Sequence, residues 1–352
     1  MEKFNALSCI CWLKDLAEHS GAAALLGNEY EPVVEMAKIY DLGEPTMDFY
    51  AESPLIGKPG VDLSVSYPGI AFLNDSLVEG HPLKEAGDFT HEYISLLAKH
   101  YPNILNYATV YLEGDTSKGT PEDLAVFLTL RDAAVYKILP ELMKLQGMEE
   151  RIPALENILR KCEKYLGLNQ IGFMNSREGR PIRLNLVTTH DKLDDIFEGL
   201  KILGCEHLIK QCEEKLRSIE ELEILGFVLG IDVLEDGSIG STFGIEMGPL
   251  ELLPIQHRRM FQTENYKKFV QLLKDWQLAD ARMEVIPKCS WDKNFSIETT
   301  GGNLETYLYS FPSHFKLKWN KEGPMPAKIY LSMRRMDKQH SINETIPDEG
   351  LY

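Results

Sequence analysis

The chain has 352 residues, a length that fits one large domain or about two smaller ones. Hydrophobic residues make up 44% of the chain and charged residues 26%, which excludes a largely disordered protein. The formal net charge of -17, from 37 basic and 54 acidic residues, excludes the basic footprint of a typical nucleic-acid-binding protein. Any anionic ligand must therefore be held by a local basic cluster.

The N-terminal stretch MEKFNALSCICWLKDLAEHS has a short apolar core interrupted by Lys14 and Asp15, which indicates a helix and not a signal peptide. No window reaches the roughly 18 apolar residues of a membrane span. The six cysteines include no Cys-x-x-Cys pair, so neither a disulfide scaffold nor a structural zinc site is expected. These features predict a cytoplasmic protein without a membrane span.

In chain order, the apolar spacing in residues 4–16 and 32–40 predicts a helical segment over residues 1–58. Residues 61–75 then alternate between apolar and polar, which predicts a β-hairpin that turns at Pro68-Gly69.

A possible strand follows at residues 108–113. Thr120, a proline and two acids then have the order of a helix N-terminus, and the helical pattern continues to about Leu166. A break is expected near Gln146-Gly147.

The second half of the chain contains a loose repeat of two alternating strands joined by a turn with an acid before a glycine. Such turns favour β-hairpins. The three copies are 171–188, 229–247 and 314–333, with turns at Glu178-Gly179, Asp236-Gly237 and Glu322-Gly323.

Helical patterns at 191–203, 206–222 and 265–276 separate these hairpins. The sequence therefore predicts repeated α-β-β-α units over residues 59–335, after the segment 1–58 and before a polar, acidic tail at 336–352.

Each predicted hairpin has one apolar and one polar face, because side chains alternate across a strand. Ile329, Leu331 and Met333 share a face in the last strand, opposite Lys328 and Tyr330. Two architectures fit this pattern: an open antiparallel sheet covered by helices on one side, or a closed barrel with a polar interior. Closure is favoured because it leaves no sheet edge exposed.

The α-β-β-α pattern and the Lys328-Ile329-Tyr330 triplet resemble the ABBA family of aromatic and indole prenyltransferases. The resemblance spans residues 61–334 and implies an α+β fold, an antiparallel barrel surrounded by helices. It also implies transfer of an isoprenyl group from an allylic diphosphate, such as dimethylallyl diphosphate, to an aromatic small molecule or peptide side chain. No metal and no cofactor are implied.

The resemblance also implies roles for individual residues. Lys328 and Tyr330 look like the family's K-x-Y motif, in which the lysine holds the diphosphate and the tyrosine shields the allylic cation. Asp75 or Glu246 would accept the proton of the aromatic acceptor. Further cations for the diphosphate would come from Arg183, Lys316, Lys318 and Arg334.

Two other interpretations stay open. A non-catalytic barrel of the same kind could bind a peptide or small ligand beside a biosynthetic pathway. Residues 194–198 spell DDxxE, similar to the magnesium–diphosphate motif of helical terpene synthases, although acids in the first turn of a helix are also favoured by the helix dipole.

Overall fold

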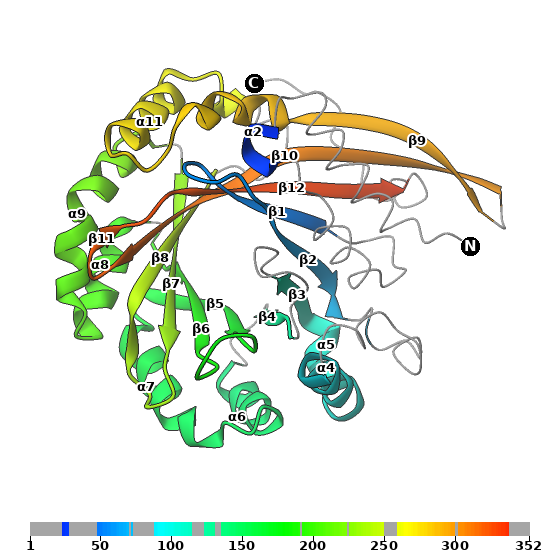
Figure 1. Cartoon of the computed structure of the whole chain (residues 1–352). Helices are drawn as coiled ribbons and strands as arrows, with labels where there is room; N and C mark the ends of the chain where they lie inside the picture. The colour runs from blue at the N-terminus through cyan, green and yellow to red at the C-terminus, as the bar shows by residue number, and fades with distance from the viewer. Residues whose placement is uncertain are drawn as a thin grey trace.

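The computed structural model describes residues 23–27, 48–69, 72, 88–114, 123–130, 135–190, 192–223, 225–249, 259–299 and 302–337. Their strands form one antiparallel sheet (Figure 1). The strands are β1 (Asp48–Pro54), β2 (Asp62–Pro68), β3 (Ala108–Gly114), β4 (Ala125–Leu130), β5 (Leu166–Phe173), β6 (Ile182–Thr188), β7 (Leu225–Val233), β8 (Ile239–Pro249), β9 (Trp291–Thr299), β10 (Gly302–Asn320), β11 (Gly323–Pro324) and β12 (Lys328–Asp337).

The sheet closes on itself. From β12 the pairing runs through β1 to β8 in chain order, and β8 then pairs with β10, which also pairs with β12. The closing contact joins residues 243–247 of β8 to residues 315–319 of β10. These ten strands form a closed antiparallel barrel, so the open sheet considered from the sequence is excluded. β9 lies outside the ring and pairs with the first half of β10.

Helices lie outside the barrel. In Figure 1, α4 and α5 lie outside β3, and α6 to α9 follow the outer side of β5 to β8. α11 packs on β10, where the ring centroids of Phe269 and Phe315 are 5.0 Å apart. The helices are α2 (Ala23–Leu26), α4 (Asp88–His100), α5 (Pro102–Tyr107), α6 (Val135–Leu145), α7 (Ile152–Cys162), α8 (Leu193–Ile202), α9 (Glu206–Glu220) and α11 (Glu264–Asp275), with short 3-10 turns at Glu149–Arg151, Ala281–Glu284 and Ile286–Cys289.

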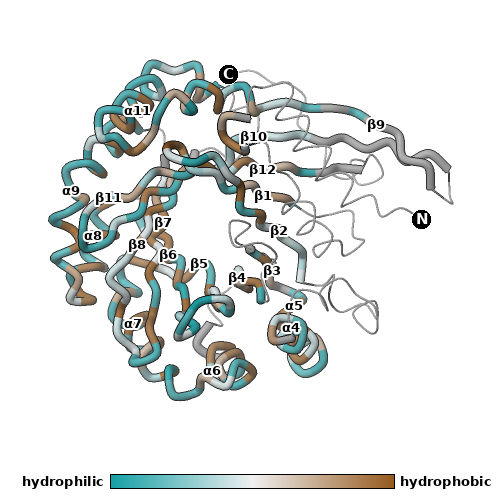
Figure 2. The backbone as a smooth tube through the Cα atoms, viewed as in Figure 1, coloured by the Kyte–Doolittle hydropathy of each residue, from teal (hydrophilic) through white to brown (hydrophobic). Residues whose placement is uncertain are grey.

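The main hydrophobic core fills the layer between helices and barrel. One face of each strand supplies it, for example Ile329, Leu331 and Met333 of β12, all buried. Figure 2 shows brown and teal alternating along helices and strands, as expected where each element buries one side. The apolar strand faces expected from the sequence are therefore the faces that the helices cover, which leaves the polar faces directed into the barrel.

The three hairpins of the second half are confirmed as β5–β6, β7–β8 and β10–β12. Gly179, Gly237 and Gly323 have positive φ, the conformation for which a turn requires glycine. The three helices expected between the hairpins correspond to α8, α9 and α11, and the strand expected at 108–113 corresponds to β3. The helix break at Gly147 is also present, again with positive φ.

Three expectations for the first half are wrong. Residues 48–54, expected to be helical, form β1, so the barrel begins before residue 59. Residues 61–75 do not form a hairpin at Pro68-Gly69, because β2 already has β1 on one side and β3 on the other. Residues 125–130 form β4 in place of the helix expected after Thr120.

The two ends of the chain mostly lie outside the described residues. This applies to the helices expected at 4–16 and 32–40 and to residues 338–352 of the expected tail, whereas Met336 and Asp337 still belong to β12. None of the helices in the described ranges is long and apolar enough to cross a membrane.

Candidate functional site

The polar faces of β10, β12 and β1 meet at one part of the barrel interior. Pairing places Lys316 beside Lys328, and Tyr330 between His314 and Glu52. The sequence predicted the two lysines and the tyrosine as site residues. Because neighbouring strands lie roughly 5 Å apart, this register brings their side chains together.

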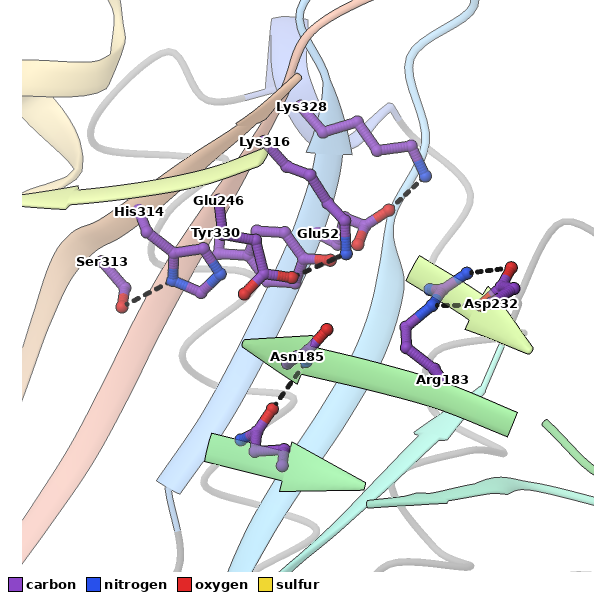
Figure 3. A network of polar contacts seen from close by, with 11 residues as sticks. Glu52, Arg183, Asn185, Asp232, Glu246, Ser313, His314, Lys316, Lys328 and Tyr330 are labelled. Atoms are coloured by element: carbon purple, nitrogen blue, oxygen red, sulfur yellow. Dashed lines mark hydrogen bonds and ion pairs between the residues drawn. The ribbon is translucent and has the colours of Figure 1, made fainter. Parts of the chain in front are cut away.

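Lys316 is the centre of this group. Its ammonium group lies 2.7 Å from a carboxylate oxygen of Glu246 on β8 and donates to the hydroxyl of Tyr330 at 3.3 Å. Only 6% of Lys316 is exposed, and Figure 3 shows Lys316, Glu246 and Tyr330 converging. Burial alone raises the pKa of Glu246, but the charge of Lys316 outweighs it and lowers that pKa. Glu246 is therefore an ionised carboxylate held by a buried cation.

His314 completes the tyrosine's surroundings. Its ring stacks on Tyr330 with the centroids 4.1 Å apart, and its Nδ1 lies 3.1 Å from the hydroxyl of Ser313. Burial lowers the pKa of His314, so the ring is neutral at pH 7. The ring of His314 thus covers one face of Tyr330. The ammonium group of Lys316 lies 5.6 Å from the centroid of the Tyr330 ring.

Glu52 of β1 is the partner of Lys328. The two side chains form a hydrogen-bonded ion pair, and Asp62 of β2 lies 3.5 Å from the same ammonium group. Burial alone raises the pKa of Glu52, but Lys328 and Lys316 outweigh it and lower that pKa. Lys328 is held between two carboxylates, so an anion that binds Lys328 has to compete with them.

Arg183 lies on β6, in another part of the wall. It makes two hydrogen bonds to the carboxylate of Asp232 on β7, at 2.8 and 2.9 Å, and Arg177 approaches the same carboxylate at 3.7 Å. Burial alone raises the pKa of Asp232, and the two guanidinium groups lower it. Arg183 is therefore committed to a bidentate pair, the strongest geometry for an arginine and a carboxylate.

Arg334 lies further along β12, beyond Ser332. It pairs with Asp48 of β1 at 3.1 Å and is partly exposed. Burial raises the pKa of Asp48 to about 6 against the opposing charge of Arg334. The residue register separates this pair from Lys328 by six positions, so Arg334 does not join the Lys316 group.

Lys318 differs from the other predicted cations. Within the described residues it forms no ion pair, although it lies on the same face of β10 as Lys316. Burial and the charges of Lys316 and Arg183 lower the pKa of Lys318 to about 8. It is the predicted cation whose charge is least compensated.

A smaller apolar cluster lines the wall formed by β3, β4 and β5. The ring of Phe127 covers Gly172, where an added Cβ would lie 2.3 Å from it, and Met174 and Ala125 pack beside it. Tyr111 joins this cluster, and its ring lies 6.2 Å from that of Tyr50 on β1. The barrel interior therefore has one charged wall and one aromatic wall.

The remaining sequence predictions fall elsewhere. Asp75 lies outside the described residues, so its role stays a prediction. Asp194 and Asp195 of the DDxxE run lie on the outer helix α8. Asp194 pairs with Arg217, and Asp195 accepts a hydrogen bond from the backbone N–H of His190 at 2.8 Å. Among the described residues no group of three or more His, Cys, Asp or Glu side chains could hold a metal ion.

Sequence reasoning missed Glu52, Asp232 and His314, which all contact predicted site residues. Glu52 lies in a stretch read as helical, although Phe49, Ala51 and Ser53 alternate with Asp48, Tyr50 and Glu52, the signal of a strand. Asp232 precedes the turn of its hairpin. The alternation along one strand does not show which residue of the neighbouring strand it faces, so its pairing with Arg183 was not predicted. His314 is the first residue of the predicted hairpin 314–333 and lies on the same face as Lys316, but no role was assigned to it.

No protein-family model matches this chain, and no curated protein sequence matches it.

Proposed function

We propose that the protein is an aromatic prenyltransferase with an ABBA-type barrel, which transfers an isoprenyl group from an allylic diphosphate to an aromatic acceptor. One observation carries the proposal. Lys316 and Lys328 lie beside Tyr330 inside a closed barrel, with the carboxylates of Glu246 and Glu52 directly against the two lysines.

The order of elements supports the proposal. The barrel is built from five successive strand pairs: β1–β2, β3–β4, β5–β6, β7–β8 and β10–β12. Helices stand between these pairs along the chain and outside them in space. This is the arrangement that the ABBA resemblance implies.

In the proposed reaction the ammonium groups of Lys316 and Lys328 turn from their carboxylates to the diphosphate. The allylic C–O bond breaks, and the diphosphate leaves with the bonding electron pair. The lysines stabilise the charge that develops on it. The ring of Tyr330 offers a π face to the allylic cation and excludes water from it.

The acceptor's aromatic carbon then forms the new C–C bond, and its proton passes to a carboxylate. Glu246 and Glu52 are the described candidates, because each is ionised and each is freed when its lysine moves to the diphosphate. Asp75 stays in this role as a prediction from the sequence.

A second function is favoured by a different observation. Four of the five predicted cations have a carboxylate partner: Lys316 with Glu246, Lys328 with Glu52, Arg183 with Asp232 and Arg334 with Asp48. Charges that are compensated in this way do not need an anion. A barrel that binds a neutral peptide or small ligand without chemistry fits the same interior.

The test is incubation of the full chain with dimethylallyl diphosphate and a panel of tryptophan, tyrosine and aromatic peptides, followed by mass spectrometry for the prenyl increment. We expect product from the natural chain and at least a hundredfold less from Lys328→Met, since one lost cation costs roughly 10²–10³ in rate. Lys321→Met removes an exposed lysine at the β10–β11 turn and serves as the matched control.

Absence of product with every acceptor, together with no measurable binding of inorganic diphosphate, rejects the transferase and favours the binding protein. Equal losses in Lys328→Met and Lys321→Met also reject it, because the effect then has no connection to the barrel interior.

A further inference from the structure

Four polar side chains meet outside the barrel, between α4, α6 and the turn that joins β5 to β6 (Figure 1). We call them the arginine cluster: Tyr93 of α4, Gln146 directly after α6, Arg151 of the short 3-10 turn that follows, and Arg180 of the β5–β6 turn. The ring of Tyr93 packs on Phe173 of β5, which belongs to the core between helices and barrel. The arginine cluster is therefore separate from the polar interior of the barrel.

The members of the arginine cluster are linked by a chain of contacts. Arg151 donates from its two terminal nitrogens to the carbonyl oxygens of Arg180 and Gly179, at 2.9 and 3.1 Å. Arg180 donates to Oε1 of Gln146 at 2.8 Å. Gln146 in turn lies close enough to the hydroxyl of Tyr93 to oppose part of the rise in the pKa of Tyr93 that burial causes. The four side chains therefore form one continuous group.

Each member of the arginine cluster has a buried polar atom without a hydrogen bond. These atoms are Oη of Tyr93, Nε2 of Gln146 and the Nε atoms of Arg151 and Arg180, and none has a hydrogen-bond partner within the described residues. Tyr93, Gln146 and Arg151 are only 1%, 3% and 5% exposed. Unpaired buried polar groups are rare and costly. Four such groups in neighbouring side chains, each able to donate, match a shared acceptor.

The charges of the cluster indicate that this acceptor is an anion. Arg180 has no ion pair in the described part of the chain, and burial and the charge of Arg151 lower its pKa. Glu150 is exposed and lies 3.7 Å from Nε of Arg151. Asp123 is the other nearby acid, and its carboxylate accepts from the backbone N–H of Thr90 at 3.2 Å. A water molecule satisfies donors but compensates no charge, whereas an anion does both.

The backbone at Arg180 also indicates a functional role. Its φ of +40° lies in the left-handed region, which residues other than Gly, Asn and Asp rarely adopt. The guanidinium group is held 3.8 Å from the centroid of the Phe89 ring on α4. Backbone strain of this kind is concentrated at ligand sites, where the surrounding contacts maintain it. At Arg180 the strained turn directs a cation to a buried cluster.

The burial of the cluster limits the size of the ligand. Three of its four members are at most 5% exposed, so a bulky organic anion does not fit among them. An oxyanion such as phosphate has several acceptor oxygens, more than four single donors satisfy. A monatomic anion needs only the donors that the cluster provides.

We infer that the arginine cluster binds a halide ion such as chloride, with its four donors around the ion. The bound ion fixes the β5–β6 turn to α4 and α6. The same turn carries Arg177, whose guanidinium group lies 3.7 Å from the carboxylate of Asp232 on β7. The halide therefore also supports the position of Arg177. The inference is independent of the proposed transfer reaction.

The test is the thermal midpoint of the full chain in sodium chloride and in sodium gluconate at equal ionic strength, so that charge screening is constant. We expect the midpoint to rise by roughly 2 °C for each tenfold increase in chloride above its Kd, and to stay constant in gluconate. Bromide locates the site: we expect its anomalous diffraction peak within hydrogen-bonding distance of the arginine cluster.

Tyr93→Phe removes one donor and keeps the ring, so about tenfold more chloride should be needed for the same rise. Tyr266→Phe is the matched control, because it removes another buried hydroxyl without a hydrogen-bond partner in the described residues, at a ring packed on Phe261. It should leave the chloride dependence unchanged. Arg180→Met removes a cation and should abolish the rise, and it carries the test if Tyr93→Phe does not fold.

Several results overturn the inference. Equal midpoints in chloride and gluconate do so, as does a chloride dependence that survives both Tyr93→Phe and Arg180→Met. A bromide peak away from the cluster rejects the site. Equal losses in Tyr93→Phe and Tyr266→Phe show a general effect of buried hydroxyls and also reject it. A midpoint that rises with phosphate but not with chloride rejects the halide.

Discussion

Lys316 and Lys318 lie two residues apart on β10 and point into the same interior, yet their surroundings differ. Opposite Lys316 on β8 stands Glu246, whose carboxylate lies 2.7 Å from the ammonium group. Opposite Lys318 stands Gly244, which offers only backbone. The first lysine has an ion-pair partner, and the second has none among the described residues.

This difference shows that one strand face can hold two lysines in different electrostatic surroundings. Lys316 and Lys328 each have a carboxylate partner, so their charges are compensated without a ligand. An anion that binds either lysine has to replace its carboxylate partner. Lys318 has no ion pair among the described residues, and Gly244 beside it supplies no side chain.

The largest expected effect comes from breaking a pair. Glu52→Ala leaves Lys328 beside Asp62 alone and removes a buried carboxylate, which we expect to lower the free energy of unfolding by about 3 kcal/mol at pH 7. Urea denaturation measures it. The folded-state pKa of Glu52 is lowered, so its stabilising contribution is full above about pH 5 and is lost as the pH falls toward that pKa.

Glu52→Gln keeps the size and one hydrogen-bond acceptor and is the control; it should lose less stability than Glu52→Ala. A loss below about 1 kcal/mol for Glu52→Ala would mean that the pair with Lys328 contributes no more than an exposed ion pair.

An intermediate effect of opposite sign is expected at Lys318. Lys318→Met removes a charge that has no partner, and we expect it to raise stability by about 1–2 kcal/mol at pH 7, with allowance for partial exposure. The pKa of Lys318 is about 8 in the folded chain, below its usual 10.5. Between these values the unfolded chain holds more protons, so the natural protein gains stability as the pH rises.

The advantage of Lys318→Met should therefore shrink between pH 8 and pH 10.5. Parallel denaturation of both proteins at pH 7 and pH 10 measures this. An advantage that does not change with pH shows that packing, and not the charge of Lys318, is responsible.

The smallest effect is expected from Gly244→Ala. The added methyl group meets only near-ordinary contacts, and alanine in a strand is slightly favoured over glycine. We expect a change in unfolding free energy within about 1 kcal/mol, read from the shift in thermal midpoint. A loss of several kcal/mol would show that the packing of the barrel requires a glycine at position 244.

The sequence predicted the second half of the barrel well, and the reason lies in its interior. Along β6 and β12 polar residues such as Arg183 and Lys328 alternate with apolar ones, so the period of two is visible. β4 has Ala125 and Phe127 on the interior face, because it belongs to the aromatic wall. Both faces of β4 are then apolar, and such a short run cannot be distinguished from a buried helix.

The sequence predicted the cations of the site together with Glu246 and Tyr330, but it missed two of the acids. Lysines and arginines of the polar faces were visible, and a basic interior was the expectation. The acids that neutralise them come from distant strands: Glu52 and Lys328 are 276 residues apart, and Asp232 lies 49 residues from Arg183. Such pairing depends on register and barrel closure, which no local pattern contains.

The strand order of the barrel also constrains how the chain can fold. β1 pairs with β12, the last strand of the ring. The second edge of β1 is therefore covered only after nearly the whole chain has been synthesised. Contacts of such separation slow folding, and until they form the edges of β1 and β8 stay available to other chains. Before β10 and β12 have been synthesised, strands β1 to β8 can form at most a sheet with two open edges, because the ring closes only through β10 and β12.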